Sequence, residues 1–234
     1  MKRAFTLFEL TLVIAIAGIL LAFALPRFER DGVAEATDQI VSHIGYARSL
    51  AMQDNKFKAK AADAKPSKWF KQRWSIAFNE TKNVCGGNEK SWKYTVFYDI
   101  DVRTPNNFSG NLNSKLEVAR DPSNAAKFMS SGWSGISKND CERTSDRFNL
   151  GKKFGIIGVE FIGACGEKKA RTLSFDEFGR PMQVVSATGG GGASRAFDRI
   201  LHDKCEIILS SKRKKSVISV SPVTGFIEIK YLDL

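Results

Sequence analysis

Apolar residues dominate the start of the chain and then give way to two repeating patterns. The segment from Phe5 to Leu25 is 21 residues long and carries one charged side chain, Glu9. An apolar stripe then recurs at spacings of three and four as far as about residue 52, formed by Val33, Ala36, Ile40, Ile44, Ala47 and Ala51. Such spacing is typical of an amphipathic helix. The pattern therefore predicts an α+β chain whose helical part comes first.

Short runs of alternating apolar and polar residues predict strands from residue 69 onward. The predicted strands are 74–78, 92–98, 156–162, 171–176, 206–210, 216–221 and 225–231. The last of these alternates most regularly, as an antiparallel strand with one wet face does. Residues near 100–150 are rich in polar and turn residues, and we expect an irregular insertion there. His43 lies one residue from the apolar stripe, and we expect it to be exposed or half-buried.

The first apolar segment is long enough to predict a membrane-spanning helix. As a helix, residues 5–25 would rise about 31 Å, which matches the hydrocarbon core of a bilayer. Lys2 and Arg3 precede it, which favours a cytoplasmic start and places the rest of the chain outside. A secretory signal would have a shorter apolar region and a small-residue cleavage site after it, and Pro26 and its neighbours supply none. A plain single-span anchor remains an alternative.

Glu9 is the residue that a plain anchor leaves unexplained. A carboxylate inside a spanning segment costs a few kcal/mol unless it is paired. No Lys or Arg lies between residues 4 and 26, so we expect the partner to come from another chain. Cleavage between Ala4 and Phe5 would create an α-amino group at Phe5, which could neutralise Glu9 of a neighbouring subunit.

The run Lys2-Arg3-Ala4 followed by Phe5-Thr6-Leu7-Phe8-Glu9-Leu10 resembles the leader and first turn of type IV prepilins and type II secretion pseudopilins. In that family a prepilin peptidase cuts before a Phe and methylates its amine. A Glu fifth in the mature chain and a Pro at position 22 correspond to Glu9 and Pro26 here. The chain departs from the family in one position, because Ala4 stands where Gly is usual.

Three further segments are similar to the GspH/FimT-type minor pseudopilins and minor pilins. They are Tyr46–Asn55, Leu173–Pro181, and Val217–Ser221 with Thr224–Ile229. Residues 100–150 have no counterpart that we can match. The similarity therefore covers the end of the helix and the C-terminal half of the β-rich part.

The resemblance implies a type IV pilin-like α+β fold in four parts. These are a leader at 1–4, a transmembrane or filament-core helix at 5–25, an amphipathic continuation at 26–55 and an antiparallel β-rich periplasmic head at 56–234. It also implies a structural subunit of a secretion pseudopilus or a type IV pilus, held in the inner membrane by a single pass before assembly. Its partners would be prepilin peptidase, other pilin or pseudopilin subunits and an inner-membrane assembly platform.

Four cysteines are consistent with an exported head in an oxidising compartment. Cys85, Cys141, Cys165 and Cys205 allow three pairings, and no C-x-x-C spacing points to zinc or redox chemistry. We favour Cys165 with Cys205, because both flank predicted strands of the C-terminal sheet. Cys85 and Cys141, both in polar loops, would then form the second disulfide.

The net charge of +11 falls to +9 when Lys2 and Arg3 leave with the leader. One basic cluster lies at 56–73 among Phe57, Trp69, Phe70 and Trp74. A second is Lys212-Arg213-Lys214-Lys215, at the tip of a predicted hairpin. Cations among aromatic rings suit a nucleic-acid strand, so DNA binding in natural transformation is the alternative function. A solvated basic face is the simpler interpretation of the same residues.

Other candidate chemistry is weakly indicated, and we expect neither an enzyme nor a resident cofactor or metal. Gly189–Gly192 lacks the strand, helix and Lys that a phosphate-binding loop needs. Asp99, Asp101 and Asn106 could supply oxygen ligands to Ca²⁺, but a solvated turn is the simpler interpretation. The two histidines, His43 and His202, form no nucleophile–base grouping with a Ser or Cys.

Overall fold

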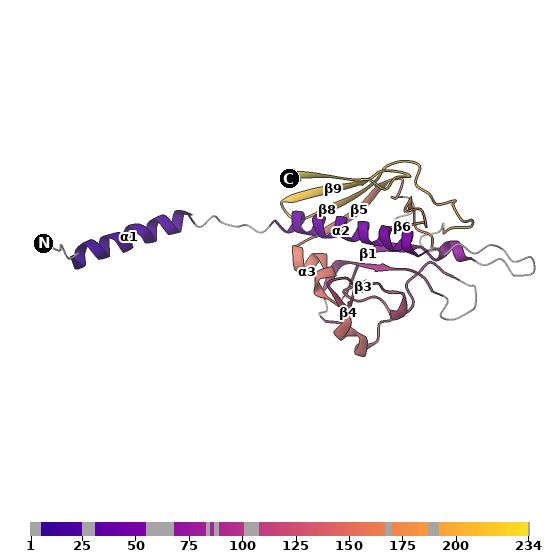
Figure 1. Ribbon diagram of the computed structural model, residues 1–234, viewed down its shortest axis with the longest axis horizontal. Helices are drawn as coiled ribbons and strands as arrows, with labels where there is room; N and C mark the ends of the chain where they lie inside the picture. Colours follow the sequence, from indigo (N-terminus) through magenta and orange to yellow (C-terminus); the bar gives the residue numbers. More distant parts are fainter. Residues whose placement is uncertain are drawn as a thin grey trace, which may run out of the picture. The chain divides into compact units, whose positions relative to one another are not determined.

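The computed structural model divides the chain into two compact units, Met1–Asp31 and Gly32–Leu234, which are considered separately. It describes residues 6–24, 31–54, 68–82, 85–86, 89–100, 108–166, 170–186 and 192–233. The first unit contains the helix α1 (Leu7–Ala24), and the second, the head, contains the remaining elements (Figure 1).

The predicted pilin-like arrangement, with one long helix whose first half spans a membrane, is wrong. The described helices at this end are separate: α1 ends at Ala24 and α2 (Gly32–Gln53) begins at Gly32 in the other unit. Eighteen residues of α1 rise about 27 Å, short of the ~30 Å hydrocarbon core. Within the described ranges, no helix combines the length and the apolar character that crossing a bilayer requires. The same finding contradicts the predicted single-pass inner-membrane location.

The head is also larger than the pilin-like arrangement predicts. One antiparallel sheet has the order β2-β1-β6-β7, formed by β1 (Trp74–Lys82), β2 (Lys90–Phe97), β6 (Thr172–Phe175) and β7 (Pro181–Met182). The other has the order β10-β9-β8-β5, formed by β5 (Gly158–Gly163), β8 (Cys205–Ser210), β9 (Lys214–Val220) and β10 (Ile227–Asp233). All seven predicted strands are confirmed within a few residues, whereas β7 was not predicted.

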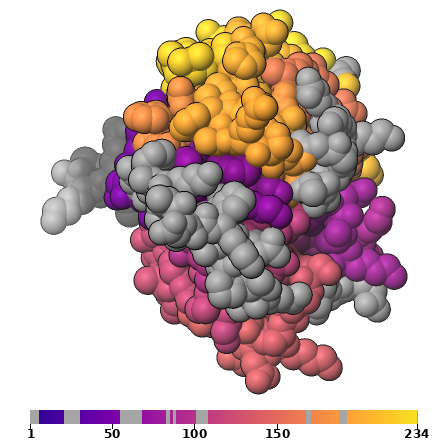
Figure 2. All heavy atoms as spheres, turned by 90° about the vertical axis from the view of Figure 1, so that its right-hand side faces the viewer, coloured from indigo at the N-terminus to yellow at the C-terminus, as the bar shows by residue number. Residues whose placement is uncertain are grey.

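The helix α2 lies between the two sheets and provides one side of the core to each. All six residues of the predicted apolar stripe are buried, with Ile40 and Ile44 fully inaccessible. In Figure 2 the atoms of α2 are visible between the orange and yellow C-terminal strands and the pink residues of the insertion. The Thr37 hydroxyl lies 2.6 Å from that of Ser216 on β9, so a polar contact joins α2 to the second sheet.

A close backbone contact fixes the start of α2. A Cβ atom at Gly32 would overlap the carbonyl oxygen of Phe154, at the end of the short helix α3 (Leu150–Phe154). Only glycine therefore allows α2 and α3 to approach this closely. The contact ties the insertion to the first turn of the main helix.

The insertion has more structure than the sequence indicated. It contains β3 (Arg120–Asp121), β4 (Asn124–Phe128) and the short 3-10 helices η2 (Lys115–Glu117), η3 (Lys138–Arg143) and η4 (Asp146–Phe148). Val118, Phe128, Trp133 and Ile136 form a small core of their own. This second core explains why a polar segment can fold without an obvious periodic pattern.

Candidate functional site

The exposed apolar surface of α1 is the first candidate site. Nine of its large apolar side chains are between 49% and 82% exposed: Leu7, Phe8, Leu10, Leu12, Val13, Ile14, Ile16, Ile19 and Leu20. At about 100° per residue these positions occupy every side of the helix. A helix that is apolar all round is normally buried, so α1 has the surface of an element that needs partners.

The first turn of α1 is closed by a reciprocal cap that sequence reasoning missed. The Thr6 backbone N–H donates to Glu9 Oε2 at 2.9 Å, and the Thr6 hydroxyl donates to the same oxygen at 3.0 Å. The Glu9 N–H donates to the Thr6 hydroxyl oxygen at 3.3 Å. Thr6-x-x-Glu9 is the capping-box spacing, which is a readable sequence signal.

This cap changes the interpretation of Glu9. The carboxylate has a partner within its own helix, so the need for a second chain does not follow from Glu9 alone. The hydrogen bonds from Thr6, the backbone bond first and the hydroxyl bond second, hold the pKa of the Glu9 carboxyl below its ordinary value. Glu9 is therefore a charged group at the start of an exposed apolar helix. The other residues predicted for processing and assembly, Ala4, Phe5 and Pro26, lie outside the described residues.

The basic hairpin tip is the second candidate site. Residues 211–213 connect β8 to β9, and Lys212, Arg213 and Lys214 are exposed while Lys215 is half-buried. The Ser211 hydroxyl accepts hydrogen bonds from the backbone N–H groups of Arg213 and Lys214, at 3.3 and 3.1 Å. A compact turn thus presents several cations together, as the predicted hairpin requires.

Two described members of the first basic cluster, Arg73 and Trp74, have structural contacts. Arg73 is buried, forms an ion pair with Glu177 and lies 5.2 Å from the centre of the Trp69 ring. The Trp74 indole N–H donates to Asp54 at 3.1 Å, and its ring packs on Tyr98. These contacts make Arg73 and Trp74 part of the packed head, whereas Lys68 is exposed and Trp69, Phe70 and Lys71 are half-buried. Lys56, Phe57, Lys58, Lys60 and Lys65 lie outside the described residues.

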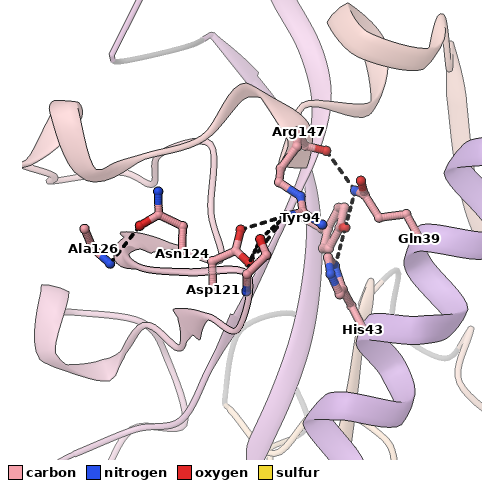
Figure 3. A network of polar contacts seen from close by, with 8 residues as sticks. Gln39, His43, Tyr94, Asp121, Asn124, Ala126 and Arg147 are labelled. Atoms are coloured by element: carbon pink, nitrogen blue, oxygen red, sulfur yellow. Dashed lines mark hydrogen bonds and ion pairs between the residues drawn. The ribbon is translucent and has the colours of Figure 1, made fainter.

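A buried polar network joins α2 to β2 and the insertion (Figure 3). The Tyr94 hydroxyl accepts from Gln39 Nε2 at 2.6 Å and lies 2.7 Å from His43 Nδ1. Gln39 also donates to the Arg147 carbonyl oxygen at 2.8 Å. The Arg147 guanidinium bonds Asp121 at 3.0 Å. The polar groups of the network bond to one another across α2, β2 and the insertion, so we interpret it as structural.

Burial sets the protonation states in this network. His43 is 5% exposed, which contradicts the expectation of an exposed or half-buried side chain. Desolvation, with a smaller contribution from the Arg147 charge, lowers the pKa of His43 to about 4. Desolvation raises the pKa of the Tyr94 hydroxyl. Both groups are therefore neutral at neutral pH.

The four cysteines form two disulfides. Cys85 is bonded to Cys141, and Cys165 to Cys205, with Cα–Cα distances of 5.2 and 5.1 Å. These are the pairs favoured from the sequence.

Asp99 is buried and not part of a solvated turn, since its carboxylate accepts from the Gly110 N–H and, at 3.2 Å, from the Ser109 hydroxyl. Asp101 and Asn106 lie outside the described residues.

Comparison with known proteins adds no identification. No family model matches the chain, and neither a curated protein nor a solved structure is significantly similar to it. The functional conclusion therefore depends on the residues and geometry of this chain.

Proposed function

We propose that the chain is a structural subunit that assembles with pilin or pseudopilin subunits through α1. The observation that carries the proposal is the exposed apolar circumference of α1, from Leu7 to Leu20. Burying each of its large apolar side chains would contribute about 1.5–3 kcal/mol. Copies of the same helix are the occupant with matching chemistry, because an apolar helix packs most readily against other apolar helices.

The distribution of these side chains favours a filament over a closed pair. A dimer would cover one side of α1 and leave the apolar side chains of the opposite side in water. Contacts that join different faces of neighbouring copies can continue indefinitely and produce a helical array. A secretion pseudopilus and a type IV pilus are both arrays of this kind, and the N-terminal resemblance supports this class.

Processing by prepilin peptidase belongs to the same proposal. The basic residues Lys2 and Arg3 directly precede the apolar segment, and Ala4-Phe5 is the boundary between them. Cleavage there would leave Phe5 as the N-terminal residue, with an amine four positions before Glu9. Glu9 Oε2 accepts hydrogen bonds from the backbone N–H and the hydroxyl of Thr6. The carboxylate has a second oxygen, which can accept a hydrogen bond from the amine of a neighbouring subunit.

The assembly test is a charge placed in the middle of α1. In peptidase-processed full-length chain, Ile14→Asp should abolish sedimentable filaments, because an assembled core would bury an unpaired carboxylate. The matched control is Ile162→Asp on β5, which changes a similarly apolar side chain that is 40% exposed on the head. Urea unfolding should show that the head of each variant remains folded. Filaments of Ile14→Asp as abundant as those of the parent would contradict the proposal.

DNA binding by the hairpin tip is the second candidate function. The exposed Lys212, Arg213 and Lys214 favour it, because clustered cations bind phosphates and release counterions. The buried Trp74 and Arg73 argue against base stacking, so we expect weak binding without sequence preference. Titration of labelled DNA should show Kd rising steeply with salt, and replacing residues 212–215 by Ala should weaken binding and flatten that dependence. An absence of binding at low salt would exclude this function.

A further inference from the structure

The strand β10 is an edge strand whose side chains are exposed on both faces of the sheet. Among the described residues it pairs only with β9, and the sheet order places it at the end. Ile227, Ile229 and Tyr231 face the same side of the sheet as the buried Val220 and Ile218 of β9. Even so, Ile229 and Tyr231 are 40% and 50% exposed. The apolar face of the sheet thus continues one strand beyond the core that covers it.

The outer edge of β10 offers a defined set of backbone groups. The Ser221 N–H donates to the Phe226 carbonyl oxygen at 2.8 Å, so these two residues form a hydrogen-bonded pair across the β9–β10 hairpin. Bonding alternates along an antiparallel strand, and the register is regular from Ile227 to Asp233. Residues 228, 230 and 232 therefore bond to β9, while Ile227, Ile229 and Tyr231 direct their N–H and C=O groups outward.

We propose that β10 pairs antiparallel with β10 of a second copy of the chain, around a two-fold axis at Ile229. In such a pair, residues at equal distances from the two-fold axis lie opposite each other. The outward-directed residues are the odd-numbered ones, and hydrogen bonds form only where one of them lies opposite another. This requires the axis to pass through a residue and not between two residues. Centres at 228 or 230 would oppose Glu with Glu or Lys with Lys. A centre at 231 would oppose Ile229 with Asp233. Of the centres from 228 to 231, only Ile229 gives favourable pairs throughout.

In that register both faces of the new strand pair are complementary. Ile229 meets Ile229 of the second copy, and Ile227 meets Tyr231, an aromatic and β-branched pair of the kind that stabilises sheets. On the other face Glu228 meets Lys230 in both directions. About six backbone hydrogen bonds would form, two for each outward residue pair. Lys230 alone would protect an edge from pairing, but here an opposite charge faces it.

Sedimentation equilibrium of the full chain in a density-matched mild detergent tests this pairing. We expect a concentration-dependent dimer that Glu228→Lys and Lys230→Glu each weaken, raising Kd by roughly 10–30-fold, because like charges then face each other twice. The two single variants mixed together should dimerise better than either alone. The double variant Glu228→Lys/Lys230→Glu should recover the parent's Kd.

Controls separate this interface from α1. Glu160→Lys makes the same charge change on β5 at the opposite edge and should leave dimerisation unchanged. The Ile14→Asp background removes association through α1, so a dimer that persists there depends on the head alone. The Glu228 ion pair with Lys204 is exposed, and its loss should leave the unfolding midpoint almost unchanged. A monomer at all concentrations, or a dimer insensitive to both reversals, would overturn the proposal.

Discussion

Nδ1 of His43 on α2 lies 2.7 Å from the hydroxyl oxygen of Tyr94 on β2, inside the protein. The His43 ring also stacks on Phe148, with ring centres 5.3 Å apart. One imidazole thus joins the main helix, the first sheet and the insertion. Its burial and, to a smaller extent, the charge of Arg147 lower its pKa to about 4, so the imidazole stays neutral until the pH falls to about that value.

Acid should weaken the head through His43. In the unfolded chain the imidazole has a pKa near 6.5, whereas in the folded chain it is about 4. Between these two pH values the unfolded state binds a proton and the folded state does not. The free energy of unfolding should therefore be constant above about pH 6.5 from this source and fall by roughly 3 kcal/mol by pH 4. Urea unfolding from pH 7.5 to 4.5 measures the slope. His43→Gln, which cannot titrate, should flatten it, and equal slopes would contradict the assignment.

Removing one partner of the Arg73–Glu177 pair should be costly. Their side chains are 2% and 7% exposed, so Glu177→Gln or Arg73→Met leaves a buried charge without its counter-ion. We expect a loss of about 3–5 kcal/mol in unfolding free energy. The matched control is Asp146→Asn, which breaks an ion pair with Lys152 whose side chains are more than 60% exposed and should cost less than about 1 kcal/mol. Similar losses for the two pairs would show that Arg73 is not held as described.

The disulfides should differ in accessibility. Cys165 and Cys205 are buried, whereas Cys85 and Cys141 are half-buried. Limited reduction followed by thiol alkylation and mass spectrometry should modify Cys85 and Cys141 first. Replacing both Cys165 and Cys205 by Ser should lower the unfolding free energy by about 2–4 kcal/mol, because the bond closes a loop with a sequence separation of 40. Alkylation of Cys165 before Cys141 would contradict this order.

Two substitutions of Glu9 can separate its cap from its charge. Glu9→Gln keeps a side-chain acceptor for Thr6, as capping boxes allow, but removes the negative charge. Glu9→Val removes both. If the carboxylate pairs with the amine of a neighbouring Phe5, both variants should fail to enter the filament while their heads unfold at the parent's urea midpoint. Normal incorporation of Glu9→Gln would show that the cap is sufficient and the charge pairing unnecessary.

Local patterns in the sequence predicted most elements of the head. The stripe from Val33 to Ala51 and the seven alternating strands are periodic, and periodicity identifies which face of an element is buried. It does not identify what covers that face. His43 is buried because Phe148 and Arg147 return from a polar segment more than 100 residues later, and no local pattern marks that return.

The errors at the N-terminus have a different cause. The apolar run at residues 5–25 predicts a single span and places Glu9 inside it. The helix instead begins at Leu7, which makes Thr6 its N-cap and Glu9 a capping residue. The spacing of Thr6 and Glu9 could have indicated this, because a Thr followed three residues later by Glu marks a helix start.

Photo-crosslinking from α1 tests the assembly of the chain most directly. A photoreactive phenylalanine analogue replaces Ile14 in peptidase-processed full-length chain, which is mixed with isotopically labelled parent chain, irradiated and mapped by mass spectrometry. We predict crosslinks from position 14 to residues 7–24 of the labelled copy, and none between helices when the analogue is placed at Ile162. Polymers whose crosslinks from position 14 map only to their own chain or to head residues would contradict assembly through α1.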